Sequence, residues 1–260
     1  MRAIAEACKE IGAPAIIGLS EGERDHMGVR EAVALRDALR EDSKIPLFLN
    51  ADHSKSVDTA KAALDAGFDS VHIDLSARSF EENIGETKRV VAYARAKGAM
   101  ISVEGELGYL KGESKVVQKK IGVSPDDYTK PEEARRFTEE TGVDRLAIVV
   151  GNIHGISLDE PDLDIERIRE IRAIIPEEVA LVLHAASGIP SDQIRAAIHA
   201  GIANIHINTD LRVAYANTLR KELIAHPDEV ASYKLDAGAM AAMREVVKEK
   251  LTLFGSINKI

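Results

Sequence analysis

The stretch PLFLNADHS, residues 46–54, begins as a buried β-strand and ends on ionisable groups. Three apolar residues follow Pro46, and then Asp52 and His53 stand side by side where a purely structural strand would pass into a turn. Ionisable groups gathered in one place are typical of functional sites. One such ending could arise by chance, so the question is whether other apolar strands of the chain end in the same way.

Seven short apolar segments, rich in β-branched residues, alternate with longer segments of helical period. The expected strands are residues 14–20, 46–53, 70–76, 100–108, 145–155, 179–188 and 204–211. The expected helices between them are residues 30–42, 56–67, 79–98, 130–142, 164–175 and 190–201. Strands that are apolar throughout, each followed by an amphipathic helix, predict a parallel sheet covered by helices.

An α/β chain of this kind can form an open doubly wound sheet or a TIM (β/α)8-type barrel. No glycine-rich dinucleotide fingerprint follows the first expected strand, and polar residues collect at the carboxyl ends of the strands, where a barrel builds its site. We therefore predict the barrel. We expect one domain over residues 1–260, with residues 212–260 as closing helices.

A barrel of this type has eight strands, and the sequence offers seven. Residues 1–12 have helical period, and we interpret them as the helix after a missing first strand. We expect an assembled metal site with an open slot beside Ser20 and Asn208. A start placed too late, a partner chain that fills the gap and a degenerate, inactive barrel would each explain the count. The nearly complete site motifs favour the first explanation.

Composition narrows the possible functions of the 260 residues. The net charge is −9 and aromatic residues make up 4%, which argues against non-specific binding of nucleic acid. The single cysteine, Cys8, excludes an internal disulfide and fits a reducing cytoplasm. No apolar segment is long enough for a signal peptide or a membrane span. We expect a cytoplasmic protein that binds neither nucleic acid nor membrane.

The other expected strands do end on ionisable or polar side chains. These endings are Asp74, Glu104 with Glu106, His154, His184, and His206 with Asn208 and Asp210. Three imidazoles at separate strand ends, His53, His154 and His184, can converge on one metal and leave a ligand position open, as catalytic zinc requires. His72 lies within a strand, and we interpret it as a hydrogen-bonded core histidine.

Several of these motifs together carry a family resemblance. The segments LNADHS, SVHIDLSARSFEENI, VEGELG, TGVDRLAIVVGNIHG, LVLHAASGIP and INTDLR resemble, in order and spacing, the class II, metal-dependent fructose-bisphosphate and tagatose-bisphosphate aldolases. The resemblance runs over about residues 14–220. It implies that His53, His154 and His184 hold a catalytic Zn²⁺. It also implies that Glu106 can hold the metal in an inward resting position and that Asp74 can bind a second cation, divalent or monovalent.

The resemblance further implies the groups that handle protons and substrate. Asp52 resembles the acid that serves the carbonyl oxygen of the aldehyde product, and Glu113 is the one local candidate for the base at the C–H bond. The phosphate contacts that it implies are Gly155, Ser187, Asn208, Thr209 and, beside them, Asp210, with Ser20 at the other end of the sugar. By family precedent we expect a homodimer or a larger homo-oligomer that acts on a phosphorylated sugar.

Three departures from the family pattern stand in these motifs. Ala185 and Ala186 replace a pair of glycines, and their amides can bind phosphate only if neither position requires a positive φ. His206 stands where asparagine is usual, so it can contact substrate or metal or alter specificity. The sequence around Glu113 also departs from the usual loop.

Three classes of function remain open. The first is an aldolase that cleaves fructose 1,6-bisphosphate to dihydroxyacetone phosphate and glyceraldehyde 3-phosphate, with the tagatose epimer as its alternative. The second is a zinc hydrolase that activates water, although HAASG and INTD look like a phosphate cradle. The third is a non-catalytic barrel that binds metal or sugar phosphate.

Overall fold

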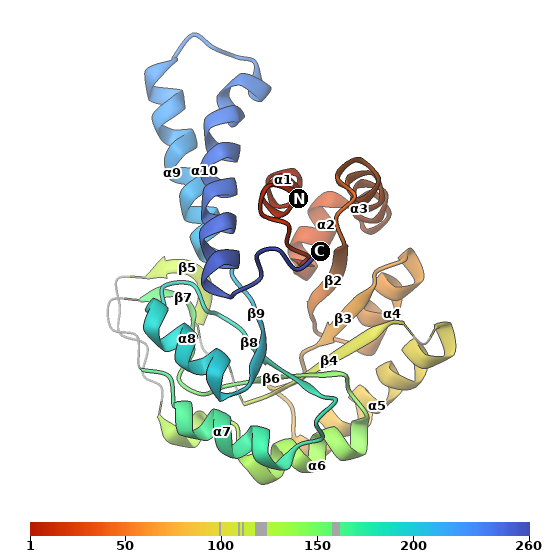
Figure 1. Ribbon diagram of the computed structural model, residues 1–260. Coiled ribbons are helices and arrows are strands. Elements are labelled where there is room, and N and C mark those ends of the chain that lie inside the picture. Colours follow the sequence, from red (N-terminus) through yellow and green to blue (C-terminus); the bar gives the residue numbers. More distant parts are fainter. Residues whose placement is uncertain (99, 109, 111, 118–123, 158–161) are drawn as a thin grey trace.

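The computed structural model contains an open, curled sheet of seven parallel strands in the order β1-β2-β3-β4-β6-β8-β9 (Figure 1). It describes residues 1–98, 100–108, 110, 112–117, 124–157 and 162–260. The strands of this sheet are β1 (Ala15–Leu19), β2 (Leu47–Ser54), β3 (Ser70–Ile73), β4 (Ser102–Leu107), β6 (Arg145–Ile148), β8 (Ala180–Leu183) and β9 (Ile202–Ile205). Each overlaps one predicted strand, so the helix-covered parallel fold of seven strands is confirmed.

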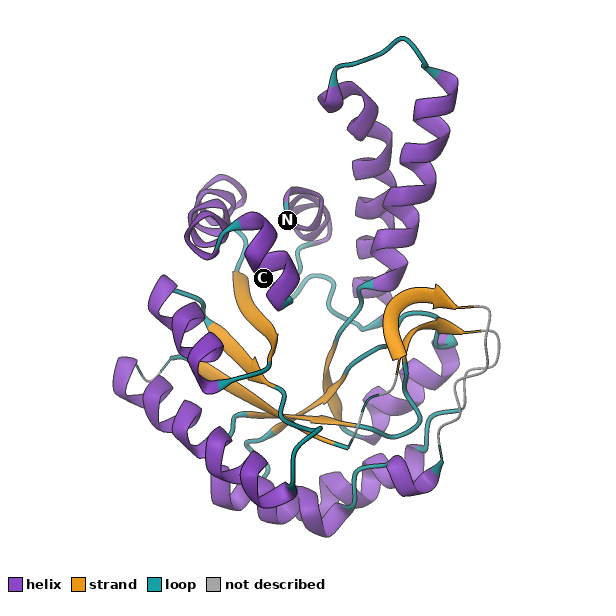
Figure 2. Ribbon diagram, turned by 180° about the vertical axis from the view of Figure 1, so that it is seen from behind, coloured by secondary structure: helices purple, strands orange, loops and turns teal. Residues whose placement is uncertain are grey.

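The helices of the described residues are α1 (Arg2–Ile11), α2 (Glu21–Met27), α3 (Val29–Ser43), α4 (Val57–Ala66), α5 (Phe80–Lys97), α6 (Pro131–Thr141), α7 (Ile165–Ile174), α8 (Ser191–Ala200), α9 (Thr209–Ala225) and α10 (Ser232–Leu253), with a 3₁₀ turn at Pro125–Asp127. Helices α3 to α8 lie on the outer, convex face of the curled sheet (Figure 2). Local signals set several of their ends. The side chains of Ser56 and Ser79 accept hydrogen bonds from the first turns of α4 and α5, and Gly67 ends α4 in the left-handed conformation.

The sheet does not close, because β1 and β9 are its edges and are not paired with each other. The consequence is visible at β1, where successive side chains point to opposite faces. Ile17, which faces the helices, is 3% exposed, whereas Ile16, which faces the inside of the curled sheet, is 43% exposed. Phe48, the partner of Ile16 on β2, is also 43% exposed. The inner face is therefore open to solvent near this edge.

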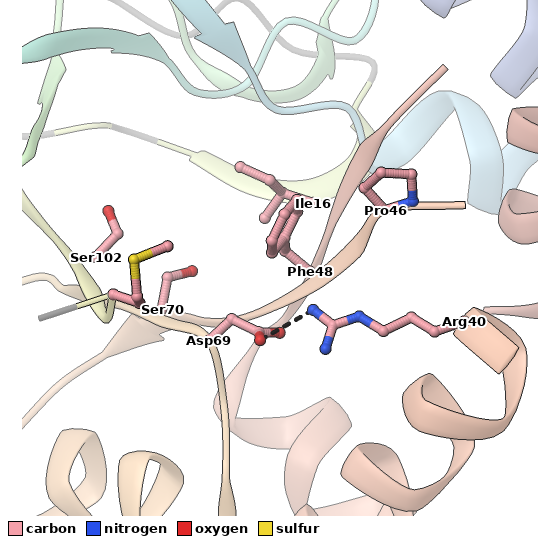
Figure 3. A pocket seen from close by; sticks show the side chains of 8 residues that line it. Ile16, Arg40, Pro46, Phe48, Asp69, Ser70 and Ser102 are labelled. Atoms are coloured by element: carbon pink, nitrogen blue, oxygen red, sulfur yellow. Dashed lines mark hydrogen bonds and ion pairs between the residues drawn. The ribbon is translucent and has the colours of Figure 1, made fainter. Parts of the chain in front are cut away.

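The uncovered inner face forms a hollow of about 620 Å³ at the amino ends of the first strands (Figure 3). Its lining residues are Ile16, Arg40, Pro46, Phe48, Asp69, Ser70, Met100 and Ser102. Arg40 and Asp69 form an ion pair in it, with 3.0 Å between Nη2 and Oδ1. None of these lining residues is a histidine, so the hollow is not the site that the strand ends predict.

Two further strands were not predicted from the sequence. β5 (Gly112–Val117) and β7 (His154–Ser157) pair in parallel in a small second sheet. The predicted strand over residues 145–155 was too long, because the chain leaves the main sheet after Ile148. It turns there through Gly151, at φ 109°, and Asn152, whose side chain accepts the Val150 amide. His154 therefore begins a separate strand.

The last two helices form an antiparallel hairpin that projects away from the sheet (Figure 1). α10 then packs against α1, and the terminal segment donates backbone hydrogen bonds from Asn258 to Ile11 and from Lys259 to Gly12. None of the helices in the described ranges combines the length and the apolar character that a membrane crossing requires.

Candidate active site

A smaller cavity, of about 150 Å³, lies at the carboxyl ends of the strands. Its lining residues are Ser20, Asp52, His53, His154, Gly155, His184, Ala185, Ser187, His206, Asn208, Thr209 and Arg212. The structure thus brings together nine of the residues that the sequence singled out as site candidates. Glu106 and Asp74 are buried beneath the cavity, and Asp210 lies beside it.

A bulge at the end of β2 explains how two consecutive residues reach one cavity. Neighbouring side chains of a regular strand point to opposite faces. The pairing of β2 with β3 shifts register between Ala51 and Ser54, and His53 takes a left-handed backbone conformation with φ 44°. Bulges of this kind redirect side chains beside functional sites. Here the bulge places both Asp52 and His53 on the cavity.

His53 lies between the other two predicted metal ligands, His154 and His184. Its ring centroid is 5.1 Å from that of His154 and 4.8 Å from that of His184. His154 is not part of any of the three described groups whose metal-binding atoms all lie within 4.8 Å of one another. Of the three predicted ligands, His154 thus lies farthest from the other metal-binding side chains of the cluster.

Two buried carboxylates lie against two of these imidazoles. Asp74 Oδ2 is 2.8 Å from His53 Nδ1, and Glu104 Oε1 is 2.6 Å from His184 Nε2. The second oxygen of Glu104 lies 3.3 Å from Arg145 Nη1. Metal-binding histidines commonly hold a carboxylate on the ring nitrogen that does not face the metal, which fixes ring orientation and tautomer. The arrangement of both imidazoles matches that pattern.

Two more histidines belong to the same cluster. The ring of His206 lies 4.0 Å from that of His184, and its Nδ1 is 3.5 Å from Asp52 Oδ1. His72 is fully buried, as predicted for a core histidine, and its Nδ1 accepts the His53 amide at 3.3 Å. Its Nε2 lies 3.1 Å from Glu106 Oε2, at an angle that does not meet the geometry of a hydrogen bond, so the prediction of a hydrogen-bonded core histidine is confirmed at Nδ1.

Burial and neighbouring charges shift the pKa values of this cluster in opposite directions. Burial, with the charge of His53, lowers the pKa of His154 to about 4, and burial beside His206 lowers the pKa of His184 well below its usual value. Burial would raise the pKa of the Asp52 carboxyl, but His53, His206 and His72 lower it well below its usual range. Burial would lower the pKa of His53, but the carboxylates of Asp52, Asp74 and Glu106 raise it above its usual value, so a metal on this ring has to displace a proton.

The wall of the cavity across from the histidines carries hydrogen-bond donors. Asn208 caps α9, and the amides of Asn208 and Asp210 donate to Ser187 Oγ at 3.3 and 3.2 Å. The Asp210 carboxylate turns away, to Lys250 Nζ at 2.8 Å. Ala185 adopts φ 57°, so one of the two alanines does occupy a left-handed position that favours glycine. Its amide is therefore held at a conformational cost.

Sequence reasoning missed Arg212, which lines the cavity near Ser20. Arg212 Nη2 lies 2.6 Å from Glu23 Oε1, and the other oxygen of Glu23 accepts hydrogen bonds from the amide and the hydroxyl of Ser20. Its place in INTDLR, one helical turn after Asn208, could have indicated that it reaches the cavity. Glu113 lies in β5 next to Gly112, the partner of His154, but its side chain lies outside the described residues.

Comparisons with known proteins agree with this architecture. The family model for class-II fructose-bisphosphate aldolases matches residues 1–259. A fructose-bisphosphate aldolase of Thermus caldophilus is 37% identical over 283 aligned residues, which cover 99% of this chain and 90% of that protein. The structure of the YdjI aldolase of Escherichia coli K12 superposes with a TM-score of 0.79 at 31% identity, covering 98% of this chain and 86% of the other. A fructose-bisphosphate aldolase structure from Campylobacter jejuni has a TM-score of 0.82 at 20% identity, over 100% and 88% of the two chains, and supports the fold.

The fold and the strand-end cavity define an α/β protein of the aldolase type. The chain belongs to the class-II fructose-bisphosphate aldolase family. The resemblance noted from the sequence motifs is therefore confirmed, and with it the general assignment to the aldolases.

Proposed function

We propose that the protein is a metal-dependent aldolase that cleaves a ketose 1,6-bisphosphate to dihydroxyacetone phosphate and glyceraldehyde 3-phosphate. The preferred substrate in this proposal is fructose 1,6-bisphosphate. One observation carries the proposal. Imidazoles with carboxylates on their outer nitrogens line the same small cavity as Asn208 and Thr209 at the amino end of α9. Nitrogen ligands for a metal and donors for a phosphate thus face each other across it.

The side chains present fit a metal ion. His53 and His184 each have one ring nitrogen on a buried carboxylate, which leaves the other for a metal, and His154 is held neutral by burial. We propose that these three histidines hold Zn²⁺. When bound, the ion would stabilise the negative charge that develops on the three-carbon fragment as the carbon–carbon bond breaks.

Two carboxylates of the chain would move the protons. Asp52 would take the proton from the hydroxyl of the substrate carbon that becomes the aldehyde, and would return it in the condensation direction. Glu113 would deliver a proton to the carbon of the three-carbon fragment. The support for Glu113 is its backbone position, since it follows Gly112, which pairs with the ligand candidate His154.

The two phosphates would occupy opposite ends of the cavity. One of them would bind to Ser187, Gly155, Asn208 and Thr209 at the amino end of α9, whose dipole attracts anions. Ser20 would bind the other, and Arg212, which the sequence did not indicate, adds a guanidinium at that end.

A second candidate function, a non-catalytic barrel that binds sugar phosphate, has one observation in its favour. Ala185 holds a left-handed conformation at the phosphate wall, where strain would loosen the cradle. A coupled assay that follows triose phosphate release from fructose 1,6-bisphosphate, with and without chelator, separates the two functions.

The assay needs a matched pair of variants. We expect His53→Ala to lose bound metal and triose phosphate release together, and His226→Ala to lose neither, because His226 lies on the surface after α9. Bound sugar phosphate with no release by the untreated protein would support the non-catalytic barrel. Release that survives removal of the metal would contradict the metal-dependent mechanism.

We also propose that the protein is a cytoplasmic homo-oligomer. The hairpin of α9 and α10 exposes apolar side chains, among them Ile224 at 82% and Tyr233 at 75%, which a second copy could cover. Light scattering after gel filtration is expected to show a dimer or larger, and Ile224→Asp to shift it toward the monomer. The buried thiol of Cys8 is compatible with a reducing compartment.

A further inference from the structure

The carboxylate of Asp52 lies between two imidazoles at the wall of the cavity. Its Oδ1 is 3.5 Å from His206 Nδ1 and 3.5 Å from His72 Nδ1. This oxygen is buried, and neither contact meets the geometry of a hydrogen bond in the described part of the chain. A buried carboxylate oxygen without a donor is costly, so one of the two rings is expected to donate to it.

Of the two rings, His72 is not free to donate. Its Nδ1 accepts the backbone amide of His53 at 3.3 Å, and a ring nitrogen that accepts a hydrogen bond carries no proton. His206 Nδ1 forms no hydrogen bond to any other described residue. The N–H of His206 is therefore the donor within reach of Asp52 Oδ1.

The main chains hold the two side chains opposite each other. The carbonyl oxygen of Asp52 accepts a hydrogen bond from Nη1 of the buried Arg24 at 3.0 Å. His206 follows β9 directly, donates its amide to the Leu183 carbonyl at 2.9 Å and accepts the Ala186 amide at 3.2 Å. The contact between Asp52 and His206 thus spans the open side of the sheet, from β2 to the edge strand β9.

The other oxygen of Asp52 has no such neighbour. Oδ2 lies over Gly18 of β1, where even an added Cβ would be 3.8 Å away. Within the described ranges, no side chain donates a hydrogen bond to Oδ2. Asp52 lines the cavity and its side chain is 15% exposed, so Oδ2 is the oxygen that a substrate hydroxyl can reach.

We propose that His206 is a positioning residue, which donates its Nδ1–H to Asp52 Oδ1 and so directs Oδ2 into the cavity. The inference rests on the proposed function, in which Asp52 takes the proton of the substrate hydroxyl. A carboxylate that rotates freely has to be ordered before each proton transfer, and a fixed donor removes that cost. His206 acts here through Asp52, without a contact of its own to substrate or metal.

Two variants of similar size separate the donor from the ring. His206→Asn keeps an N–H at the same distance along the side chain as Nδ1, whereas His206→Leu places a methyl group there. We expect His206→Leu to lower kcat about 10-fold or more, with KM changed less than about threefold. We expect His206→Asn to keep most of kcat. Zinc content, measured by mass spectrometry, is expected to be unchanged in both.

A double-mutant cycle with Asp52→Ala shows whether His206 works through the carboxylate. In that background we expect His206→Leu to change kcat by less than about twofold, because the group that His206 orients is gone. An equal loss in both backgrounds, or a loss confined to KM, would overturn the inference and make His206 a substrate contact. Loss of zinc from His206→Leu would overturn it by making His206 a metal ligand.

The imidazole also gives a test that needs no activity and no folded His206→Leu. Nitrogen NMR of the zinc-loaded chain reports which ring nitrogen carries the proton, and the His206 signal is assigned by its absence from His206→Asn. We expect a proton on Nδ1 and a shift of its signal in Asp52→Ala. A proton on Nε2 alone would overturn the inference. A proton on Nδ1 in a chain that releases no triose phosphate would refute the aldolase and leave the hydrogen bond to Asp52 standing.

Discussion

The open edge of the sheet predicts that two adjacent isoleucines of β1 contribute very differently to stability. Ile16 and Ile17 are each changed to threonine, which keeps the β-branch and replaces the ethyl group by a hydroxyl. At Ile17, 3% exposed, the loss of two buried carbons costs about 1.6 kcal/mol and an unpartnered hydroxyl about 1–3 kcal/mol more. At Ile16, 43% exposed, water can hydrate the hydroxyl, and the loss is about 1 kcal/mol.

Urea unfolding followed by circular dichroism measures both changes against the unaltered chain. We expect Ile17→Thr to lower the free energy of unfolding by about 3–4 kcal/mol and Ile16→Thr by about 1 kcal/mol, with similar slopes against urea. Equal, large losses would show that the inner face of β1 is covered in solution. The reasoning from an unpaired β1 edge would then be wrong.

Three further changes test the cavity. We expect Asp52→Ala to keep its zinc and lower kcat by roughly 100-fold or more, as steady-state kinetics with metal analysis will show; unchanged turnover removes Asp52 from the mechanism. Glu113→Ala should lower kcat with little change in KM. An unchanged kcat would mean that another group transfers the C–H proton. Ala185→Gly should raise the free energy of unfolding by about 1 kcal/mol, because φ 57° disfavours alanine; a loss of stability in urea would contradict the strain.

Much of the fold could be predicted because each main strand is a short apolar segment with turn or helix signals on both sides. The two-residue period of a strand also explains the position of one pair of carboxylates. Glu104 and Glu106 share a face, and both approach His72, at 3.8 and 3.1 Å. Local patterns of this kind survive folding because burial fixes the register of a strand.

Other features depend on contacts between distant residues. The bulge at His53 contradicts the alternation that the sequence predicts for β2, and it arises from pairing with β3. β5 and β7 stabilise each other across about forty residues, so neither has a strong local signal. His72 looks like a core residue in its own strand, and its contact with Glu106, at 3.1 Å, arises only when β3 and β4 pair.

The two edges of the sheet share no strand ladder, and besides the packing of α10 on α1 two ion pairs join the helices beside them. At the carboxyl end, Arg212 of α9 pairs with Glu23 of α2 across the cavity mouth, and both side chains are more than one-third exposed. At the other end, Lys248 of α10 pairs with Glu10 of α1 at 2.9 Å. Exposed pairs of this kind contribute about 0–1 kcal/mol each and weaken as salt rises. The wall that carries Ser20 is thus fixed less firmly than the histidine cluster, in which His53 and His184 lie against the buried carboxylates of Asp74 and Glu104. It follows that the proposed zinc ligands can remain ordered under conditions in which the end of the cavity beside Ser20 loosens.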